Sequence, residues 1–208
     1  MLFLKAMPFL TNRMNPNNIK HGHKVIKICV SGASETGHCG IDALGKAKEL
    51  GREIARNGAI LVMGGSTGFS LWVAMGAKEE GGMVIGFSPA ANEREHVEVY
   101  KLPIDYRDLV IYTGFGYGGR DILLVRSTDA LICGCGRIGT IHNFTTALQE
   151  NKPIGIFEGP WEMGDQLKDI ISKSHKDNPT IVATDDPKKM VKDLIAQINT
   201  SKIGEYKL

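Results

Sequence analysis

The sequence of 208 residues predicts an α/β fold in which helices cover both faces of a mainly parallel β-sheet. From Val25 onward, short apolar runs rich in β-branched residues alternate with longer amphipathic segments. Glycine-rich turns follow three of these runs, at the positions where a parallel sheet passes from strand to helix. We expect one domain, because this length lies within the usual range of a single domain.

The overall charge favours neither nucleic acid nor a membrane as a partner. The formal net charge is +2, and Lys and Arg are spread along the chain without forming a basic block. No apolar run approaches the roughly 20 residues of a membrane span. We therefore expect a cytoplasmic protein with no nucleic-acid or membrane partner.

The two ends of the chain are expected to lie outside the domain. Residues 1–24 lack the continuous apolar core and cleavage site of a signal peptide, so we expect a flexible leader, or a true start at Met14. The single domain is expected to span residues 25–200, followed by a short tail at 201–208.

The first half of the domain predicts three strands and two helices. The first helix is expected to end at Asn57-Gly58 and the second at Gly81-Gly82, because these residue types favour the left-handed conformation that closes a helix. The expected strands cover residues 25–30, 59–63 and 83–87, and the expected helices cover residues 41–57 and the segment through Leu71 and Ala77.

Residues 88–108 interrupt the alternation. They are polar and contain two prolines, which is typical of a long surface excursion that can lie over a binding site. We expect its charged part, Glu93, Arg94, Glu95 and His96, to be a solvated loop rather than a contributor to the site.

The alternation resumes at residue 109. A glycine-rich loop is expected at 114–119. The expected strands cover residues 109–112, 129–133, 154–157 and 180–183, and the expected helices cover 120–127, the segment through Phe144 and Leu148, 163–174 and 186–198. The complete pattern predicts a Rossmann-like, doubly wound sheet in a three-layer α/β/α arrangement.

Three turns carry the predicted chemistry, because each follows a buried strand and opens a helix. Glycine there lets the backbone approach a ligand, and the free N–H groups of a helix start suit an anionic oxygen. The chain contains no GxxxxGK[ST] loop, and the first turn, Ser31–Ser34, is not a GxGxxG turn. The predicted ligand- and phosphate-binding residues are Ser31, Gly32, Ala33, Ser34, Gly64, Gly65, Ser66, Thr67, Gly68, Gly134, Gly136, Arg137, Ile138, Gly139 and Thr140.

The segment GRDILLVRSTDALI, from Gly119 to Ile132, followed by GRIGT at 136–140, resembles the Lonely Guy (LOG) family. Its wider group contains lysine-decarboxylase-like proteins and molybdenum-cofactor carriers. The resemblance covers about residues 25–160. It implies a domain that binds a nucleoside 5′-monophosphate or related phosphoribosyl ligand, and it implies a homodimer or higher homo-oligomer. In active members an arginine and a glutamate cleave the N-glycosidic bond.

The chain matches the family's arginine with Arg120 but departs from its PGGxGTxxE motif. Cys135 replaces the proline, Arg137 the second glycine and Asn143 the glutamate. An amide cannot accept the proton that the family's reaction requires. Arg137 is expected to clamp a phosphate. His142 is disfavoured as a substitute base, since adjacent helical positions point about 100° apart.

These departures separate binding from catalysis. Our first expectation is a protein that binds the phosphoribosyl ligand with little or no hydrolysis. The alternatives are a phosphoribohydrolase, in which Arg120 and Asn143 would occupy the catalytic positions, and a carrier of a pterin-type molybdenum cofactor. Whether the protein is an enzyme stays open. We expect no required cofactor, although a bound nucleotide is compatible with the motifs.

The four cysteines, Cys29, Cys39, Cys133 and Cys135, do not form a disulfide framework in a chain of this length. Three of them fall near the expected ligand edge, close in sequence to His38 and His142. Buried free cysteine is common and no CxxC is present, so we expect free thiols and no metal or redox site.

Overall fold

Seven parallel strands form one sheet in this protein, whose structure, a computed structural model, describes residues 25–176 and 180–205. The strand order is β4-β3-β2-β1-β5-β6-β7. The strands are β1 (Lys27–Ser31), β2 (Ile60–Met63), β3 (Val84–Ser88), β4 (Leu109–Tyr112), β5 (Ala130–Cys133), β6 (Ile154–Phe157) and β7 (Ile181–Thr184). The predicted α/β, Rossmann-like fold class is confirmed.

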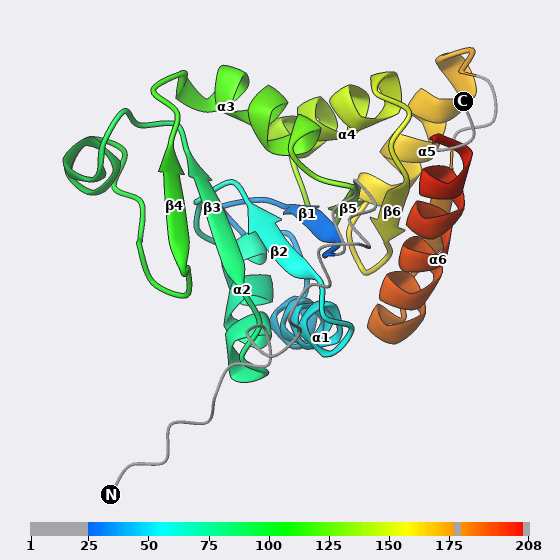
Figure 1. The fold of residues 1–208 in the computed structure, drawn as a ribbon, viewed down its shortest axis with the longest axis horizontal. Helices are drawn as coiled ribbons and strands as arrows, with labels where there is room; N and C mark the ends of the chain where they lie inside the picture. Colours follow the sequence, from blue (N-terminus) through cyan, green and yellow to red (C-terminus); the bar gives the residue numbers. More distant parts are fainter. Residues whose placement is uncertain (1–24, 177–179, 206–208) are drawn as a thin grey trace, which may run out of the picture.

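Helices cover both faces of this sheet, with α3 and α4 on one side and α1 and α2 on the other (Figure 1). They are α1 (Ala43–Arg56), α2 (Phe69–Glu79), α3 (Gly116–Arg126), α4 (Ile138–Gln149), α5 (Met163–Lys173) and α6 (Pro187–Glu205), with a short π-helix, η3 (Glu95–Val99). Among the described helices, none combines the length and apolar character that crossing a membrane requires. The leader expected at residues 1–24 lies outside the described residues.

The central strands are buried because helices shield them from both sides. Every residue of β5 and β6 is buried, whereas Leu109 and Ile111 of the edge strand β4 are exposed. Strands that are buried on both faces of a parallel sheet are expected to be continuously apolar rather than alternating.

The strand order changes direction between β1 and β5. The chain passes from β1 outward through β2 and β3 to β4, then crosses to β5 on the other side of β1. The turns that follow β1 and β5 consequently diverge to opposite faces and leave a crevice at the carboxyl edge of the sheet. This is where the predicted turns meet.

Three local expectations differ from the structure, in addition to the length of the last helix. The first is the glycine-rich loop at 114–119, because α3 begins at Gly116. Gly114 and Gly116 have φ of 69° and 62°, so they provide the sharp entry while the residues after them are already helical. Tyr117 and Arg120 thus stand three residues apart on one helix face. At the other end of the chain, α6 runs to Glu205, beyond the helix end expected at 198 and into the range expected to be a tail.

The second difference is His96, which is fully buried rather than solvated. Its Nδ1 lies 2.8 Å from Ser88 Oγ, and its Nε2 lies 3.0 Å from the Pro103 carbonyl oxygen. Both ring nitrogens have a partner, so burial costs little and the imidazole ties the excursion to the end of β3. Glu93 and Arg94 are exposed, as expected for a charged loop.

The third difference is a disulfide between Cys39 and Cys135, whose Cα atoms are 5.6 Å apart. The two cysteines are separated by 96 positions in the sequence, but the turns after β1 and β5 bring them together. The expectation of four free thiols is wrong for this pair. Cys29 and Cys133 are free and buried, as expected.

The crossing of α1 and α2 generates a prediction about stability. A Cβ atom at Gly76 of α2 would overlap the Lys48 carbonyl of α1, and one at Gly51 of α1 would overlap the Val73 carbonyl of α2. We expect Gly76→Ala to lower the free energy of unfolding by about 1–3 kcal/mol, because overpacking outweighs the gain in helix propensity. Denaturant unfolding measures this change.

Gly45→Ala is the matched control. A Cβ at Gly45 of α1 meets nothing within 4 Å. This variant should raise the free energy of unfolding by about 0.5–1 kcal/mol through helix propensity alone. Equal effects of the two substitutions would show that the helices do not touch as described.

Candidate functional site

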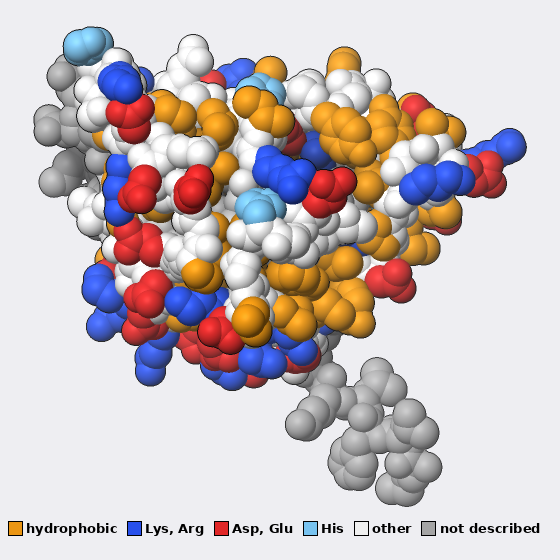
Figure 2. Space-filling model, turned by 180° about the vertical axis from the view of Figure 1, so that it is seen from behind, with side chains coloured by type: hydrophobic (Ala, Val, Ile, Leu, Met, Phe, Trp, Pro, Cys, Tyr) orange, Lys and Arg blue, Asp and Glu red, His pale blue; other side chains and the backbone are white. Residues whose placement is uncertain are grey.

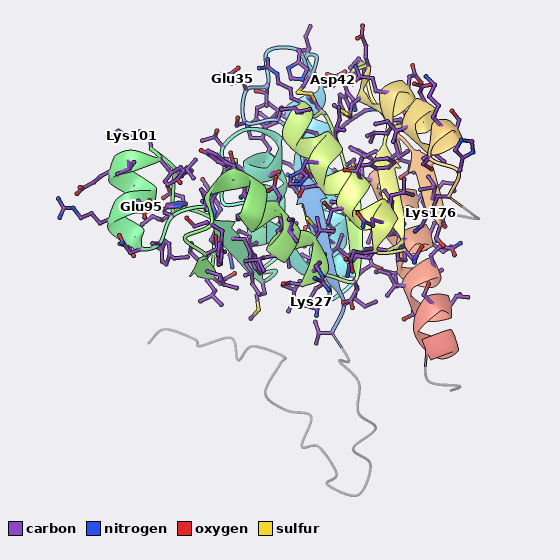
Figure 3. The ribbon with its side chains drawn as sticks, turned by 90° about the horizontal axis from the view of Figure 1, so that it is seen from above. Lys27, Glu35, Asp42, Glu95, Lys101 and Lys176 are labelled. Carbon is purple, nitrogen blue, oxygen red and sulfur yellow. A yellow bond between two sulfur atoms is a disulfide. The ribbon has the colours of Figure 1, made fainter. Side chains whose placement is uncertain are left out.

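A cleft of about 410 Å³ lies at the carboxyl edge of the sheet, within the range of small-molecule sites. The loop that carries Glu35 and Asp42 stands at this edge, at the opposite end of β1 from Lys27 (Figure 3). The residues that line the cleft are Val30, Ser31, Gly32, Ala33, Ser34, Gly64, Ser66, Ser70, Tyr117, Arg120, Asp121, Leu124, Arg137, Ile138, Gly139, Thr140 and Asn143.

The structure brings most of the predicted site residues to this cleft, but five of them lie elsewhere. Thr67 Oγ1 donates to the Ser34 carbonyl at 3.3 Å. A Cβ at Gly68 would overlap the Ala33 carbonyl, and one at Gly134 would overlap the Phe69 ring. Close packing therefore accounts for these glycines without a ligand. The predicted residues that do not line the cleft are Gly65, Thr67, Gly68, Gly134 and Gly136.

The start of α4 offers backbone donors to an anion. Arg137 is the N-cap residue, and within the described chain no side chain caps this helix. The N–H groups of Thr140 and Ile141 bond the Arg137 carbonyl at 2.8 and 3.2 Å. The N–H groups of Ile138 and Gly139 have no acceptor within the helix and point out of its start. The positive end of the helix dipole favours negative charge there.

A buried polar network backs the cleft. Asn143 Nδ2 donates to Ser31 Oγ at 2.9 Å, and Ser31 Oγ donates to Thr140 Oγ1 at 3.3 Å. All three side chains are buried. Asn143 Oδ1 is buried and has no hydrogen-bond partner among the described residues. Since buried acceptors are normally paired, this oxygen is suited to accept a hydrogen bond from a ligand.

Arg120 is fixed from several directions. Its Nη1 donates to the Phe87 carbonyl at 2.9 Å, its Nε lies 2.8 Å from Asp121 Oδ1, and its guanidinium lies 5.7 Å from the centre of the Tyr117 ring. A Cβ at Gly64 would overlap the guanidinium, so the glycine makes room for it. The predicted arginine is therefore a buried, preorganised cation in the wall of the cleft.

Asp121 is the one acidic residue that lines the cleft in the described part of the chain. Its side chain is buried, and its Oδ2 lies 3.4 Å from His142 Nδ1. Burial raises the pKa of this carboxyl, although Arg120 and His142 both act to lower it. His142, disfavoured as a base from its position in the sequence, does not line the cleft and contacts Asp121 instead.

Sequence reasoning missed several lining residues. Tyr117 was hidden by the expected loop at 114–119, although its spacing of three from Arg120 identifies it once the helix start is known. Ser70 Oγ donates to the Val30 carbonyl at 3.3 Å, a pairing that no local pattern encodes. Asp121 lies in the segment that resembles the LOG family, but no site role was predicted for it.

A second arginine, Arg137, lines the cleft, and a third, Arg107, bonds the backbone of a residue that lines it. Arg137 Nη1 donates to Glu35 Oε2 at 2.7 Å, and its side chain is 55% exposed, so it stands at the mouth of the cleft. Arg107 donates to the Ser66 carbonyl at 2.9 Å and to the Pro103 carbonyl at 2.7 Å, which ties the excursion to the turn after β2. Burial lowers the pKa of Arg107 to about 10, and the side chain remains charged at neutral pH.

The amino-acid sequence of this domain matches the profile of a known protein family. The profile of the SLOG cluster4 family aligns with residues 25–191. The chain belongs to this family. The alignment spans the whole described sheet, including every turn that lines the cleft. The resemblance seen in the glycine motifs is thus confirmed at the level of this wider family.

Known proteins with the same fold include two associated with the molybdenum cofactor. A molybdenum cofactor binding protein from Rippkaea orientalis is 25% identical, with a TM-score of 0.66 over 84% of this chain and 96% of that one. The molybdenum cofactor carrier protein of Chlamydomonas reinhardtii is 27% identical, with a TM-score of 0.66 over 83% and 99%. An uncharacterized protein from Archaeoglobus fulgidus is 34% identical over 66% of this chain and 83% of its own length.

Asp121 gives the site a testable pH dependence. We expect a carboxyl NMR titration to place the pKa of Asp121 above its ordinary value, because burial outweighs its neighbours. Between the two values the native protein holds a proton that the unfolded chain has lost. The contribution of Asp121 to the free energy of unfolding therefore falls as the pH rises through that interval.

The variant Arg120→Gln separates the effect of burial on the pKa of Asp121 from the effect of the neighbouring guanidinium. Removing the guanidinium removes an attraction that lowers the pKa of Asp121, so the pKa should rise further in this variant. A fall would show that Arg120 does not act on this carboxyl.

Proposed function

We propose that this protein binds a phosphorylated heterocyclic ligand in the cleft and holds it without efficient hydrolysis. The observation that carries the proposal is the pairing of an uncapped α4 start with the buried, unpartnered Oδ1 of Asn143. The helix start suits a phosphate, and the amide oxygen suits an N–H or O–H group of the attached ring or sugar.

The charges that line the cleft support an anionic ligand. Arg120 and Arg137 contribute two cations, and Asp121 contributes one acidic group. Asp121 is held by Arg120, and burial favours its neutral form. A bound phosphate therefore meets a surplus of positive charge and of backbone donors.

The same side chains explain why hydrolysis is not expected. A positioned acid or base is typically worth ~10²–10⁴-fold in rate. Asn143 occupies the position of the family's glutamate and uses its amide nitrogen to bond Ser31. An amide neither accepts a proton nor balances positive charge developing on a sugar ring. Binding is retained while the group that would promote cleavage is absent from this position.

A nucleoside 5′-monophosphate is the first candidate ligand, and a pterin-type molybdenum cofactor is the second. The second is favoured by the likeness to the Rippkaea orientalis and Chlamydomonas reinhardtii proteins. The molybdenum cofactor is itself a phosphorylated pterin, so the α4 start would hold its phosphate and Asn143 Oδ1 would accept from a ring N–H. The metal would then be cargo rather than a resident cofactor.

Mass spectrometry of the small molecule that co-purifies with the protein distinguishes these candidates. Thermal denaturation with added AMP, GMP or a phosphorylated pterin gives a second readout. A ligand at about 100 times its Kd should stabilise the fold by about 2.7 kcal/mol. Absence of any phosphorylated molecule in both experiments would contradict the proposal.

We expect Asn143→Asp to weaken binding of the phosphorylated ligand at least about 10-fold, because it places a carboxylate beside the anion. Isothermal titration measures the Kd. Gln149→Glu makes the same change in charge at the exposed carboxyl end of α4 and should leave the Kd unchanged. Equal Kd values in the two variants would place the ligand away from Asn143.

Asn143→Glu tests the catalytic alternative. It restores the family's carboxylate, and we expect it to release free base from AMP at a rate above that of the wild-type protein. If the wild-type protein already releases base at a rate that Arg120→Ala abolishes, the protein is a phosphoribohydrolase and the binding-only proposal is wrong.

The homo-oligomer implied by the family resemblance also has a candidate surface. Leu109 and Ile111 of β4, together with Phe115, Ile122 and Leu123 around α3, are exposed apolar side chains. Figure 2, which views the molecule from behind, shows hydrophobic side chains gathered toward its right, the side of β4 and η3. We propose that a second copy of the chain covers this surface.

A further inference from the structure

Beside the cleft, one histidine and two cysteines converge. The nitrogen and sulfur atoms of His38, Cys39 and Cys135 lie within 4.8 Å of one another. His38 Nε2 is 3.4 Å from Cys135 Sγ. The three residues come from the turns after β1 and β5, and the proposed role of the cleft does not use them.

We propose that His38, Cys39 and Cys135 form a binding site for one thiophilic divalent cation, Zn²⁺, in the reduced protein. The Cys39–Cys135 disulfide is the oxidised, metal-free form of the same site. Two thiolates and an imidazole are a ligand set that Zn²⁺ prefers, and three protein ligands leave the fourth position to water. The proposal is independent of which ligand occupies the neighbouring cleft.

The geometry fits a tetrahedral ion. Zn–S bonds of ~2.3 Å and Zn–N bonds of ~2.0–2.1 Å place a sulfur and a nitrogen ligand about 3.5 Å apart, and two sulfur ligands about 3.7 Å apart. The His38 Nε2 to Cys135 Sγ distance of 3.4 Å already matches. With the Cα atoms of the cysteines 5.6 Å apart, rotation of their side chains provides the separation of the sulfurs once the S–S bond is broken.

The backbone around the three ligands is held in place independently of the disulfide. The Ala33 N–H donates to the Cys135 carbonyl at 2.7 Å, which joins the turn after β1 to the turn after β5. The Cys39 N–H donates to the Thr36 carbonyl at 2.9 Å. Reduction therefore leaves the two thiols near each other rather than releasing a free loop.

A dithiol reductant converts the disulfide form into the metal-binding form. The reductant's two thiols transfer two electrons and two protons to the disulfide, which yields Cys39–SH and Cys135–SH and leaves the reductant as its own disulfide. Zn²⁺ then replaces the two thiol protons, which pass to solvent. Because a disulfide has no thiolate to offer, the oxidised form does not bind the ion.

The histidine must also present a lone pair on Nε2. In the disulfide form Nε2 lies 3.3 Å from the Gly136 carbonyl, and Nδ1 lies 3.5 Å from Arg137 Nη2, contacts that favour a proton on Nε2. Binding moves that proton to Nδ1. Arg137 can withdraw toward Glu35, its partner at 2.7 Å.

The site has a route to solvent. A second pocket of about 480 Å³ is lined by His38, Gly136, Arg137 and Trp161, among others. This pocket reaches the site on the side of His38, whereas Cys39 and Cys135 are buried behind it. Cys29 and Cys133 lie in strands β1 and β5 and do not belong to the cluster around His38, and burial raises the pKa of each thiol.

Counting thiols tests the oxidised form. Protein purified in air and denatured without reductant should show two reactive thiols per chain, and four after reduction. Four thiols before reduction would overturn the assignment of the disulfide as the oxidised form of the site.

Zinc titration against a chromophoric chelator tests the reduced form. Metal-free protein in a phosphine reductant should bind one Zn²⁺ per chain, and the oxidised protein none. Co²⁺ in place of Zn²⁺ should give a thiolate-to-metal charge-transfer band. No binding by the reduced protein, or no such band, would overturn the proposal.

Variants assign the ligands. Cys39→Ser, Cys135→Ser and His38→Ala should each lower the affinity for Zn²⁺ at least ~10-fold. His38 is exposed, so its variant keeps the fold, which circular dichroism verifies. Cys133→Ala removes a thiol outside the trio and should keep the wild-type affinity. Undiminished affinity in the Cys39→Ser/Cys135→Ser double variant would place the ion elsewhere and overturn the proposal.

Discussion

The parallel pairing of β1 with β5 is the constraint on which the site depends. Its register aligns Ile28 with Ala130 and Ser31 with Cys133, so both strands end at the same level. The turn after β1 leads back to α1 on one face, while the turn after β5 leads to α4 on the other. Ser31, Thr140 and Asn143 can bond one another only because this pairing brings residues more than 100 positions apart into contact.

That geometry also explains why polar and charged side chains occupy different parts of the cleft. The floor consists of short polar side chains that bond each other, and the charged groups stand to the side. Arg120 is held by the Phe87 carbonyl and Asp121, whereas Arg137 is exposed at the mouth. A buried cation in a fixed position selects for an anion, and an exposed one contributes to attraction from a distance. Both properties belong to a binding site and neither supplies a proton acceptor.

Much of the fold could be predicted because short local sequence patterns specify it. Each of the seven strands is an apolar run, and the glycine turns mark the carboxyl edge without reference to any other part of the chain. The buried His96, the start of α3 at Gly116 and the Cys39–Cys135 pair could not be predicted this way. Each depends on a contact or a backbone angle that the residue types alone do not specify: the Pro103 carbonyl for His96, φ at Gly114 and Gly116 for α3, and the β1–β5 register for the cysteines.

The candidate site divides along the same line. Ser31 and Thr140 were identified because they stand in recognisable turns. Tyr117 was missed because α3 was expected to start later, and Ser70 because its bond to the Val30 carbonyl is a tertiary contact. Gly68 and Gly134 were predicted to contact the ligand but do not line the cleft, since the sequence does not distinguish a glycine that admits a ligand from one that admits a neighbouring backbone or ring.

Gly64 and Arg120 illustrate how such packing ties distant positions together in descent. The guanidinium fills the space in which a side chain at position 64 would begin. A lineage that keeps the guanidinium in this position therefore favours glycine at 64, whatever the ligand. A lineage that exchanges the arginine for a smaller residue gains freedom at 64 and, with it, room to reshape the wall of the cleft.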